Sequence, residues 1–234
     1  MSSSRAASAL SWWSDAGVDT LVDEAPRNWL APKAAEPAAV PGPPPAPALP
    51  DDLEGFRAWF VDGARLPLGA PAAPRLGPAG DPAAGLMVLV DMPGPQDVAA
   101  GHLISGAPGA LFERMLAAMT PPLGRETIYL APLSPVRTPT GRLDAAQEKQ
   151  LAELARHHIA LVKPKAVLLF GDACAKALLG GAVAASRGRW HDLSTPAGPV
   201  KALATIRPEK LEQRPSLKKI AWEDLQMLME GLTA

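Results

Sequence analysis

Residues 144–181 read DAAQEKQLAELARHHIALVKPKAVLLFGDACAKALLGG and contain a helix, a buried strand and a second helix in direct succession. Asp144 can cap the first helix and Gln147 lies three residues later, so a capping box predicts a helix over 144–162. The run at 166–170 is wholly apolar, which is typical of a parallel strand that is buried on both faces. The second helix ends at a Gly-Gly pair, and Cys174 within it is expected to be a small buried residue.

The alternation of strands and helices extends over about 150 residues. Further strands are predicted at 86–90, 127–131 and 200–205, and further helices at 53–61, 108–119 and 216–232. This order predicts an α/β fold, a three-layer sandwich with a four-stranded, mainly parallel central sheet and helices on both faces.

The N-terminal part of the chain has a different composition. Proline and alanine dominate residues 31–52, which favours extended conformers and predicts a linker between an arm at 1–30 and a domain at 53–234. The arm holds three of the six tryptophans. Residues 8–30 are therefore either a docking motif for a protein partner or an arm that folds back onto the domain.

Composition excludes several classes of protein. A net charge of −1 over 234 residues does not fit a strongly basic nucleic-acid coat, although a local basic groove remains compatible with it. A single cysteine excludes a disulfide framework. No apolar run is long enough to cross a bilayer and the N-terminus lacks the apolar stretch of a secretory signal, so we expect a cytoplasmic protein that does not bind membranes.

Ligands of such sheets bind beyond the carboxyl ends of the strands. Asp172 is expected to cap the helix that follows the strand at 166–170, and this helix start is one candidate for nucleotide binding. Asp97, in the loop after the strand at 86–90, could face the pocket, but an exposed loop residue is the favoured interpretation. His158 is expected to complement the negative end of its helix. The segments that follow the strands are 91–106, 132–142, 171–174 and 206–215.

The same segments carry a family resemblance. Residues 89–111, LVDMPGPQDVAAGHLISGAPGAL, resemble the first motif of the uracil-DNA glycosylase superfamily, in particular its type-4 bacterial and archaeal branch. Other elements of the family follow in order at similar spacings, over roughly residues 85–230: Ile128–Leu130, Lys163–Lys165 with 167–171, Arg187-Gly188, and the closing stretch from Arg207-Pro208 to Asp224-Leu225. The resemblance implies the fold deduced above and a DNA base-excision repair protein.

Residue roles follow from the resemblance. It implies that Asp91 positions or activates the attacking water, while Arg207 stands where the family's histidine stabilises charge on the departing base. Ile104 replaces a base-stacking phenylalanine and Pro132 an asparagine that reads the uracil edge, so the active site is expected to be atypical. The predicted catalytic residues are Asp91 and Arg207, and the predicted substrate-binding residues are Met92, Pro93, Gly94, Ile104 and Pro132.

The DNA-binding residues are predicted from charge and from the same resemblance. Residues 201–219 carry six Lys or Arg and two Glu, and in the family this stretch holds a loop that enters the DNA minor groove. Leu211 is the candidate for an apolar wedge, although the stretch also fits a solvated basic loop. The predicted DNA-binding residues are Arg187, Arg189, Pro208, Lys210 and Leu211.

The type-4 branch carries an iron–sulfur cluster on four cysteines, and this chain has one, so we expect no cofactor and no metal. Two functions remain besides nucleotide binding. One is a glycosylase that hydrolyses the N-glycosidic bond of uracil or another deaminated base in single- or double-stranded DNA. The other is a catalytically silent relative that binds DNA or acts as an adaptor.

Overall fold

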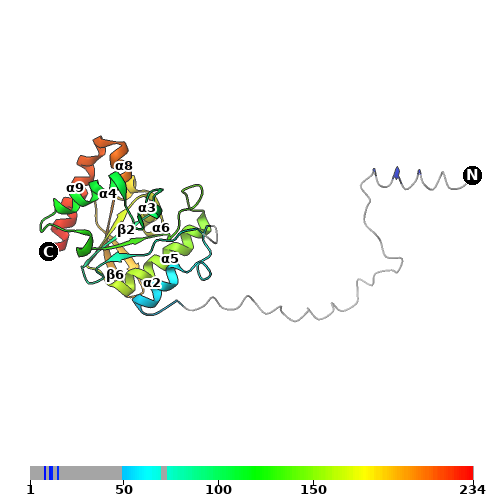
Figure 1. Cartoon of the computed structure of the whole chain (residues 1–234), viewed down its shortest axis with the longest axis horizontal. Coiled ribbons are helices and arrows are strands. Elements are labelled where there is room, and N and C mark those ends of the chain that lie inside the picture. The colour runs from blue at the N-terminus through cyan, green and yellow to red at the C-terminus, as the bar shows by residue number, and fades with distance from the viewer. Residues whose placement is uncertain (1–7, 9–10, 13–14, 16–48, 70–72, 234) are drawn as a thin grey trace, which may run out of the picture. The chain divides into compact units, whose positions relative to one another are not determined.

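A computed structural model describes residues 8, 11–12, 15, 49–69 and 73–233. The chain divides into two units, Met1–Ala48 and Leu49–Ala234, and the fold below is that of the second unit (Figure 1). Apart from residues 8, 11–12 and 15, the arm predicted at 1–30 lies outside the described residues, as does the linker predicted at 31–52 except for its last four residues, so those two predictions are untested.

The second unit is built on a six-stranded mixed sheet. Its strands are β1 (Ala79–Gly80), β2 (Leu86–Val90), β3 (Tyr129–Pro132), β4 (Ala166–Phe170), β5 (His191–Thr195) and β6 (Gly198–Thr205). The order is β1-β3-β2-β4-β6-β5. The inner four strands are parallel, as predicted, and the two edge strands pair antiparallel to their neighbours.

The predicted count of four strands was therefore too low, although the α/β class is confirmed. The two missed strands are both at the edges of the sheet. β1 has only two residues, both exposed, and β5 buries one residue of five. Edge strands in contact with water do not need the continuous apolar run that marks a strand buried on both faces, so they leave little pattern in the sequence.

Helices cover both faces of the sheet (Figure 1). Asp144 caps α5 through the capping box with Gln147, as predicted. The helices are α2 (Leu53–Val61), α3 (Asp97–Ala100), α4 (Gly106–Ala117), α5 (Ala145–Val162), α6 (Asp172–Leu179), α7 (Val183–Ser186), α8 (Pro208–Gln213) and α9 (Lys218–Thr233), with short 3-10 turns at Arg125–Thr127 and Pro215–Leu217.

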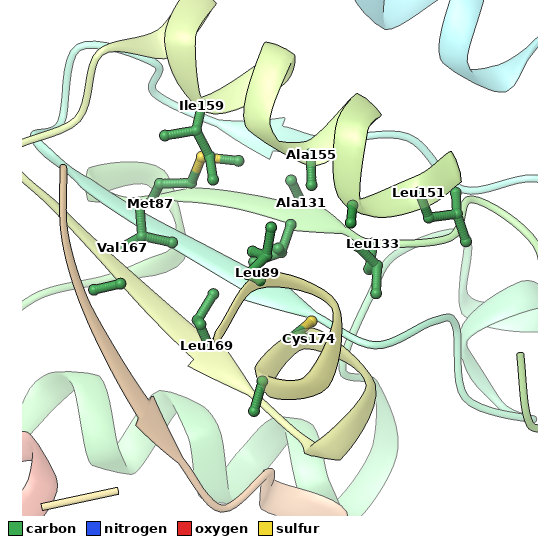
Figure 2. Close-up of a cluster of buried hydrophobic side chains, with 14 of the residues drawn as sticks. Met87, Leu89, Ala131, Leu133, Leu151, Ala155, Ile159, Val167, Leu169 and Cys174 are labelled. Atoms are coloured by element: carbon green, nitrogen blue, oxygen red, sulfur yellow. The ribbon is translucent and has the colours of Figure 1, made fainter. Parts of the chain in front are cut away.

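The five residues of β2 show how the core is divided. Met87 and Leu89 belong to a cluster with α2, α5 and α6, which Figure 2 shows with α5 along the top of the view. Leu86, Val88 and Val90 belong to a second cluster with α4 and α9. Because successive strand residues point to opposite faces, an unbroken apolar strand must be covered on both sides. The three-layer prediction is therefore confirmed.

The side chain of His158, on α5, is buried inside the protein. It does not interact with the negative C-terminal end of its helix, contrary to the sequence prediction. It is 2% exposed, and its Nε2 shares a hydrogen bond of 2.9 Å with the Tyr129 hydroxyl. The ring of Phe56 from α2 lies against the imidazole, with centroids 4.7 Å apart. Burial lowers the pKa of His158 to about 3, so the imidazole is neutral in the folded protein.

This buried histidine should make the protein acid-sensitive. The unfolded chain binds a proton at His158 near pH 6.5 and the folded chain does not, so stability is lost as pH falls through this range. Between pH 6.5 and 5 the loss from this residue should be about 1.6 kcal/mol. Urea unfolding of the wild type and of His158→Gln at several pH values should show it as a shallower pH dependence in the variant. The exposed His102→Gln is the control, and parallel pH profiles for His158→Gln and wild type would contradict the prediction.

Candidate active site

The candidate site lies where the inner parallel strands end. β2 leads directly into Asp91, β4 into Gly171, and β6 into Ile206 and Arg207. β2 pairs in register with β4, and β4 with β6, so these three ends meet at one edge of the sheet. The α/β topology thus places residues that are more than 110 positions apart in the sequence at one site.

Asp91 is held by the first turn of α6. Its Oδ1 accepts a hydrogen bond of 2.8 Å from the backbone N–H of Cys174, and the residue is 9% exposed. Burial raises the pKa of Asp91, and the Cys174 N–H and the Arg207 charge offset part of the rise. A carboxylate with a raised pKa is a better proton acceptor than one on the surface, which is the property a general base needs.

Gly171 gives Asp91 its space. Its φ is +111°, and a Cβ at this position would overlap the Asp91 carboxylate. Only glycine combines this backbone conformation with so close an approach. The carboxylate also occupies the start of α6, where the nucleotide-binding alternative would place a phosphate, and this geometry does not favour that alternative.

Arg207 lies opposite Asp91. Its Nη1 is 3.6 Å from Asp91 Oδ2 and its Nε is 3.8 Å from Glu209 Oε2, with 41% of the side chain exposed. Both distances are longer than a hydrogen bond. The guanidinium is therefore paired by charge and keeps its donors available to an anionic ligand.

Two pockets open beside this pair. The first, here called the α8 pocket, has a volume of about 400 Å³ and includes Lys210, Gln213 and Arg214 in its lining. The second, here called the α6 pocket, has a volume of about 480 Å³ and includes Arg142, Glu148 and Lys176. Both are also lined by Asp91, Asp172 and Arg207.

Of the other predicted substrate-binding residues after β2, only one lines these two pockets. Met92 lines the α6 pocket. The Pro93 carbonyl accepts a hydrogen bond of 3.4 Å from Arg137, and the Gly94 N–H donates to Asp97 at 2.7 Å, but neither residue lines the α8 pocket or the α6 pocket. Pro93 and Gly94 therefore shape the loop after β2, and their contact with substrate stays a prediction.

Ile104 and Pro132 do not reach the pockets either, and the structure gives no support to their predicted contact with a base. Ile104 is 2% exposed and packs in the second core cluster, with a φ of +51°. Pro132 is the last residue of β3 and pairs with Val90. An aliphatic side chain at position 104 gains free energy by entering the core, whereas a stacking residue must stay in the cleft.

Asp97 fixes the loop that carries Ile104, and the expectation that it is exposed was wrong. The residue is 4% exposed and accepts hydrogen bonds from the N–H groups of Gly94, Ile104 and Ser105 and from the Ser105 hydroxyl. Burial acts to raise the pKa of Asp97, but these hydrogen bonds outweigh it and lower the pKa. Asp97 is therefore an ionised structural anchor of the loop.

Helix α8 carries three of the predicted DNA-binding residues. Pro208 is its buried first residue, and Lys210 lines the α8 pocket with its Nζ 3.9 Å from Asp172 Oδ2. Leu211 is 1% exposed and belongs to the first core cluster together with Leu111 and Ala221. The prediction of an exposed wedge at Leu211 was wrong, because this side chain packs the helix onto the domain.

The predicted DNA contact at Arg187 is replaced by an internal ion pair. Its Nε and Nη2 donate to the two oxygens of Asp224 at 3.1 and 2.9 Å, and Nη2 also donates to the Ile220 carbonyl at 2.8 Å. Asp224 is 1% exposed. Arg189, in contrast, is exposed and makes one hydrogen bond of 3.3 Å to the Ala185 carbonyl, so it stays a candidate for DNA contact.

The sequence reasoning missed several pocket residues. Arg142 and Arg214 lie in segments that follow strands, so their position along the chain pointed to the site. Lys176 lies on α6, where only tertiary structure shows its direction. Asp172 is the first residue of α6 and not its cap, which is Gly171, and it accepts a hydrogen bond of 2.9 Å from the Val183 N–H.

An iron–sulfur cluster of the type-4 kind does not fit this chain. Such a cluster needs four cysteines, whereas the sequence has one, Cys174, which is buried in the core. Among the described residues no three His, Cys, Asp or Glu side chains form a group that could hold a metal ion.

The sheet order, the layers and the polar pockets at the carboxyl ends of the strands are those of an α/β domain, a class in which ligands commonly bind at this edge of the sheet. Comparison with known families gives a match to the uracil DNA glycosylase superfamily over residues 78–226. The chain belongs to this superfamily, which confirms the resemblance seen in the sequence; assignment to the type-4 branch stays a prediction. No helix in the described part of the chain is long and apolar enough to span a membrane.

Proposed function

We propose that this protein is a DNA glycosylase that hydrolyses the N-glycosidic bond of uracil or another deaminated base, with Asp91 and Arg207 as its catalytic residues. One observation carries the proposal. A buried carboxylate with a raised pKa lies 3.6 Å from a half-exposed arginine, at the strand edge where two polar pockets meet. Membership of the superfamily supports the glycosylase class.

The residues suit the charges that the reaction creates. Asp91 accepts a proton from water while the water oxygen bonds to C1′ of the deoxyribose. The bond between C1′ and the base nitrogen breaks, and its electron pair leaves with the base. Arg207 stabilises the anionic base until it takes up a proton, so the products are the free base and an abasic sugar. The Asp91 carboxylate also stabilises the positive charge that develops on the sugar.

The departures from the family pattern bear on selectivity. The linings of the two pockets contain no aromatic side chain, and Gln213 is the one amide side chain among them. Recognition then relies on charge more than on stacking or on reading of the base edge, which favours a broad range of deaminated bases over strict preference for uracil.

The test is an assay for abasic-site formation. Full-length protein in excess is incubated with labelled oligonucleotides that carry uracil, hypoxanthine or xanthine, and alkali then cleaves any abasic site. Asp91→Asn keeps an oxygen that can accept the Cys174 N–H, so it should fold but lose about 100-fold or more in rate. Arg207→Gln should lose a similar factor. The control is Asp81→Asn, an exposed carboxylate before β2.

A catalytically silent DNA-binding or adaptor relative is the second candidate. It is favoured by the position of Ile104 and Pro132 outside the pockets and by the pairing of Arg207 with Asp91. DNA binding without base release from any of the oligonucleotides would support it and contradict the first proposal. A cytoplasmic location and a protein partner for residues 8–30 also stay proposals.

A further inference from the structure

We propose that an apolar groove between α4, α8 and α9 binds an acidic, amphipathic helical segment of a partner protein. The groove, here called the α4–α9 groove, has a volume of about 240 Å³ and shares no lining residue with the two pockets beside Asp91. The inference goes beyond the proposed function, because a catalytically silent relative would keep the same surface. Three observations carry it: the apolar lining of the groove, the charges at its rim, and its position on α8.

The α4–α9 groove is lined mainly by apolar side chains. Seven of the nine described residues that line it are apolar. Leu111, Leu211 and Leu225 are buried and belong to the core clusters, whereas Met115 and Trp222 are only partly buried. A partly exposed apolar hollow that includes a tryptophan is typical of a docking surface, because a partner that covers it removes apolar area from water.

The size of the groove favours side chains of a protein over a whole small molecule. Small-molecule sites commonly have volumes of roughly 300–1,000 Å³, and this groove is smaller. A groove between helices commonly takes an amphipathic helix, which inserts apolar side chains that are three or four residues apart. The volume thus suits a short segment with one or two large apolar anchors.

The charged residues of the lining are both cations. They are Arg114 of α4 and Lys218 at the start of α9, and both are exposed. Within the described part of the chain, Arg114 has no ion pair, and Lys218 has a distant one, with its Nζ 3.9 Å from Glu212 Oε1. Glu113, the neighbour of Arg114, is already paired with Arg125 at 2.8 Å. The rim therefore complements carboxylates that flank an apolar anchor and repels a basic segment.

Helix α8 separates the groove from the α8 pocket. Lys210 and Arg214 line the pocket, while Leu211, about 100° further round the helix, lines the groove. Figure 1 shows α4, α8 and α9 together on one side of the sheet. A segment bound in the groove therefore leaves both pockets open, which fits recruitment by a partner and not inhibition of the site.

The experiment is fluorescence anisotropy with full-length protein and labelled synthetic peptides. The probe is a peptide of about 14 residues with leucine and phenylalanine at helical spacing and glutamate at the other positions. We expect it to bind with a dissociation constant on the order of 10 μM, because few side chains are buried. A matched peptide with glutamine for glutamate should bind about tenfold more weakly, and one with lysine should not bind.

A groove-filling variant tests where the peptide binds. Ala118 is the exposed C-cap residue of α4 and lines the groove, so Ala118→Trp should weaken the acidic peptide about 20-fold or more. The control is Ala117→Trp, one residue earlier, which is also exposed but does not line the groove and should bind like the wild type.

A charge-removing variant tests the rim. Arg114→Gln/Lys218→Gln should weaken the acidic peptide about tenfold and leave the glutamine peptide unchanged. The control is Lys149→Gln/Lys165→Gln, which removes two exposed lysines that do not line the groove. All these substitutions replace exposed side chains, so the fold should be kept.

Failure of the acidic peptide to bind at about 1 mM would overturn the inference, as would equal binding by the glutamine or lysine peptide or unchanged binding to Ala118→Trp. Tighter binding at the groove by laurate, or by a peptide with the sequence of residues 8–30, would also overturn it, because the occupant would then be a different one. Ala118→Trp should release base as fast as the wild type, so the abasic-site assay and the peptide assay test the two proposals separately.

Discussion

Replacement of Arg187 by methionine should lower the free energy of unfolding by about 3–5 kcal/mol, the largest change in stability that we expect from a single side chain here. Methionine keeps much of the aliphatic volume of arginine but leaves the Asp224 carboxylate uncompensated. That carboxylate is 1% exposed and would keep one side-chain hydrogen bond, from the Thr205 hydroxyl at 2.7 Å. A buried charge without its partner is far more costly than the pair is favourable.

Urea or thermal unfolding measures this effect, and the neighbouring Arg189→Met is its control, because Arg189 is exposed and donates to the Ala185 carbonyl instead of to a carboxylate. A second variant, Asp224→Asn in the Arg187→Met background, removes the unpaired charge and should recover part of the loss. If Arg187→Met unfolds like Arg189→Met, the ion pair does not have the structural role assigned to it, and Arg187 becomes available again as a DNA contact.

Replacement of Gly171 by alanine should destabilise the protein by about 3 kcal/mol or more and also abolish the activity proposed for the site. The new methyl group would overlap the Asp91 carboxylate, and alanine at a φ of +111° is strained by itself. The carboxylate must then leave the Cys174 N–H and with it its place beside Arg207. The substitution therefore disturbs the first turn of α6 and displaces the candidate general base at the same time.

The two causes can be separated by a matched glycine. Gly198 has a φ of +114° and no atom within 4 Å of an added Cβ, so Gly198→Ala measures backbone strain without a clash, about 1–2 kcal/mol. In an Asp91→Ala background, Gly171→Ala should cost only this smaller amount. A full cost that persists without the carboxylate would show that Asp91 and Gly171 are not in the close contact described here.

Much of the fold could be predicted because its signals are local. The apolar run at 86–90 is buried on both faces, and the Asp144 capping box starts α5 where the sequence indicates. These patterns reflect hydrogen bonds and burial within a few residues of the chain. The edge strands β1 and β5 were missed because their pairing depends on neighbours, and their sequences carry no strong period.

The candidate site, like the fold, was predictable only where its signals are local in the sequence. The order of strands and helices was enough to place Asp91 and Arg207 at the carboxyl edge of the sheet, because parallel strands align their ends. The sequence also carried motifs that resemble this superfamily, and the comparison confirms the superfamily over residues 78–226. It could not show which side chains of those motifs face solvent and which enter the core.

Tertiary packing decides whether a side chain points into the site or into the core. Leu211, Ile104 and Arg187 occupy positions that suggested contact with DNA or with a base, yet each is satisfied within the protein, by the core or by Asp224. Lys176, which gave no such signal, lines the α6 pocket, and Asp172, which was expected to cap α6, lines both pockets. The sequence by itself determined the succession of the four inner strands along the chain and the residues at their ends, since these follow from local periodicity and chain connectivity. Only the tertiary structure decided which of those residues form the site, because burial and ion pairing join side chains that are distant in the sequence.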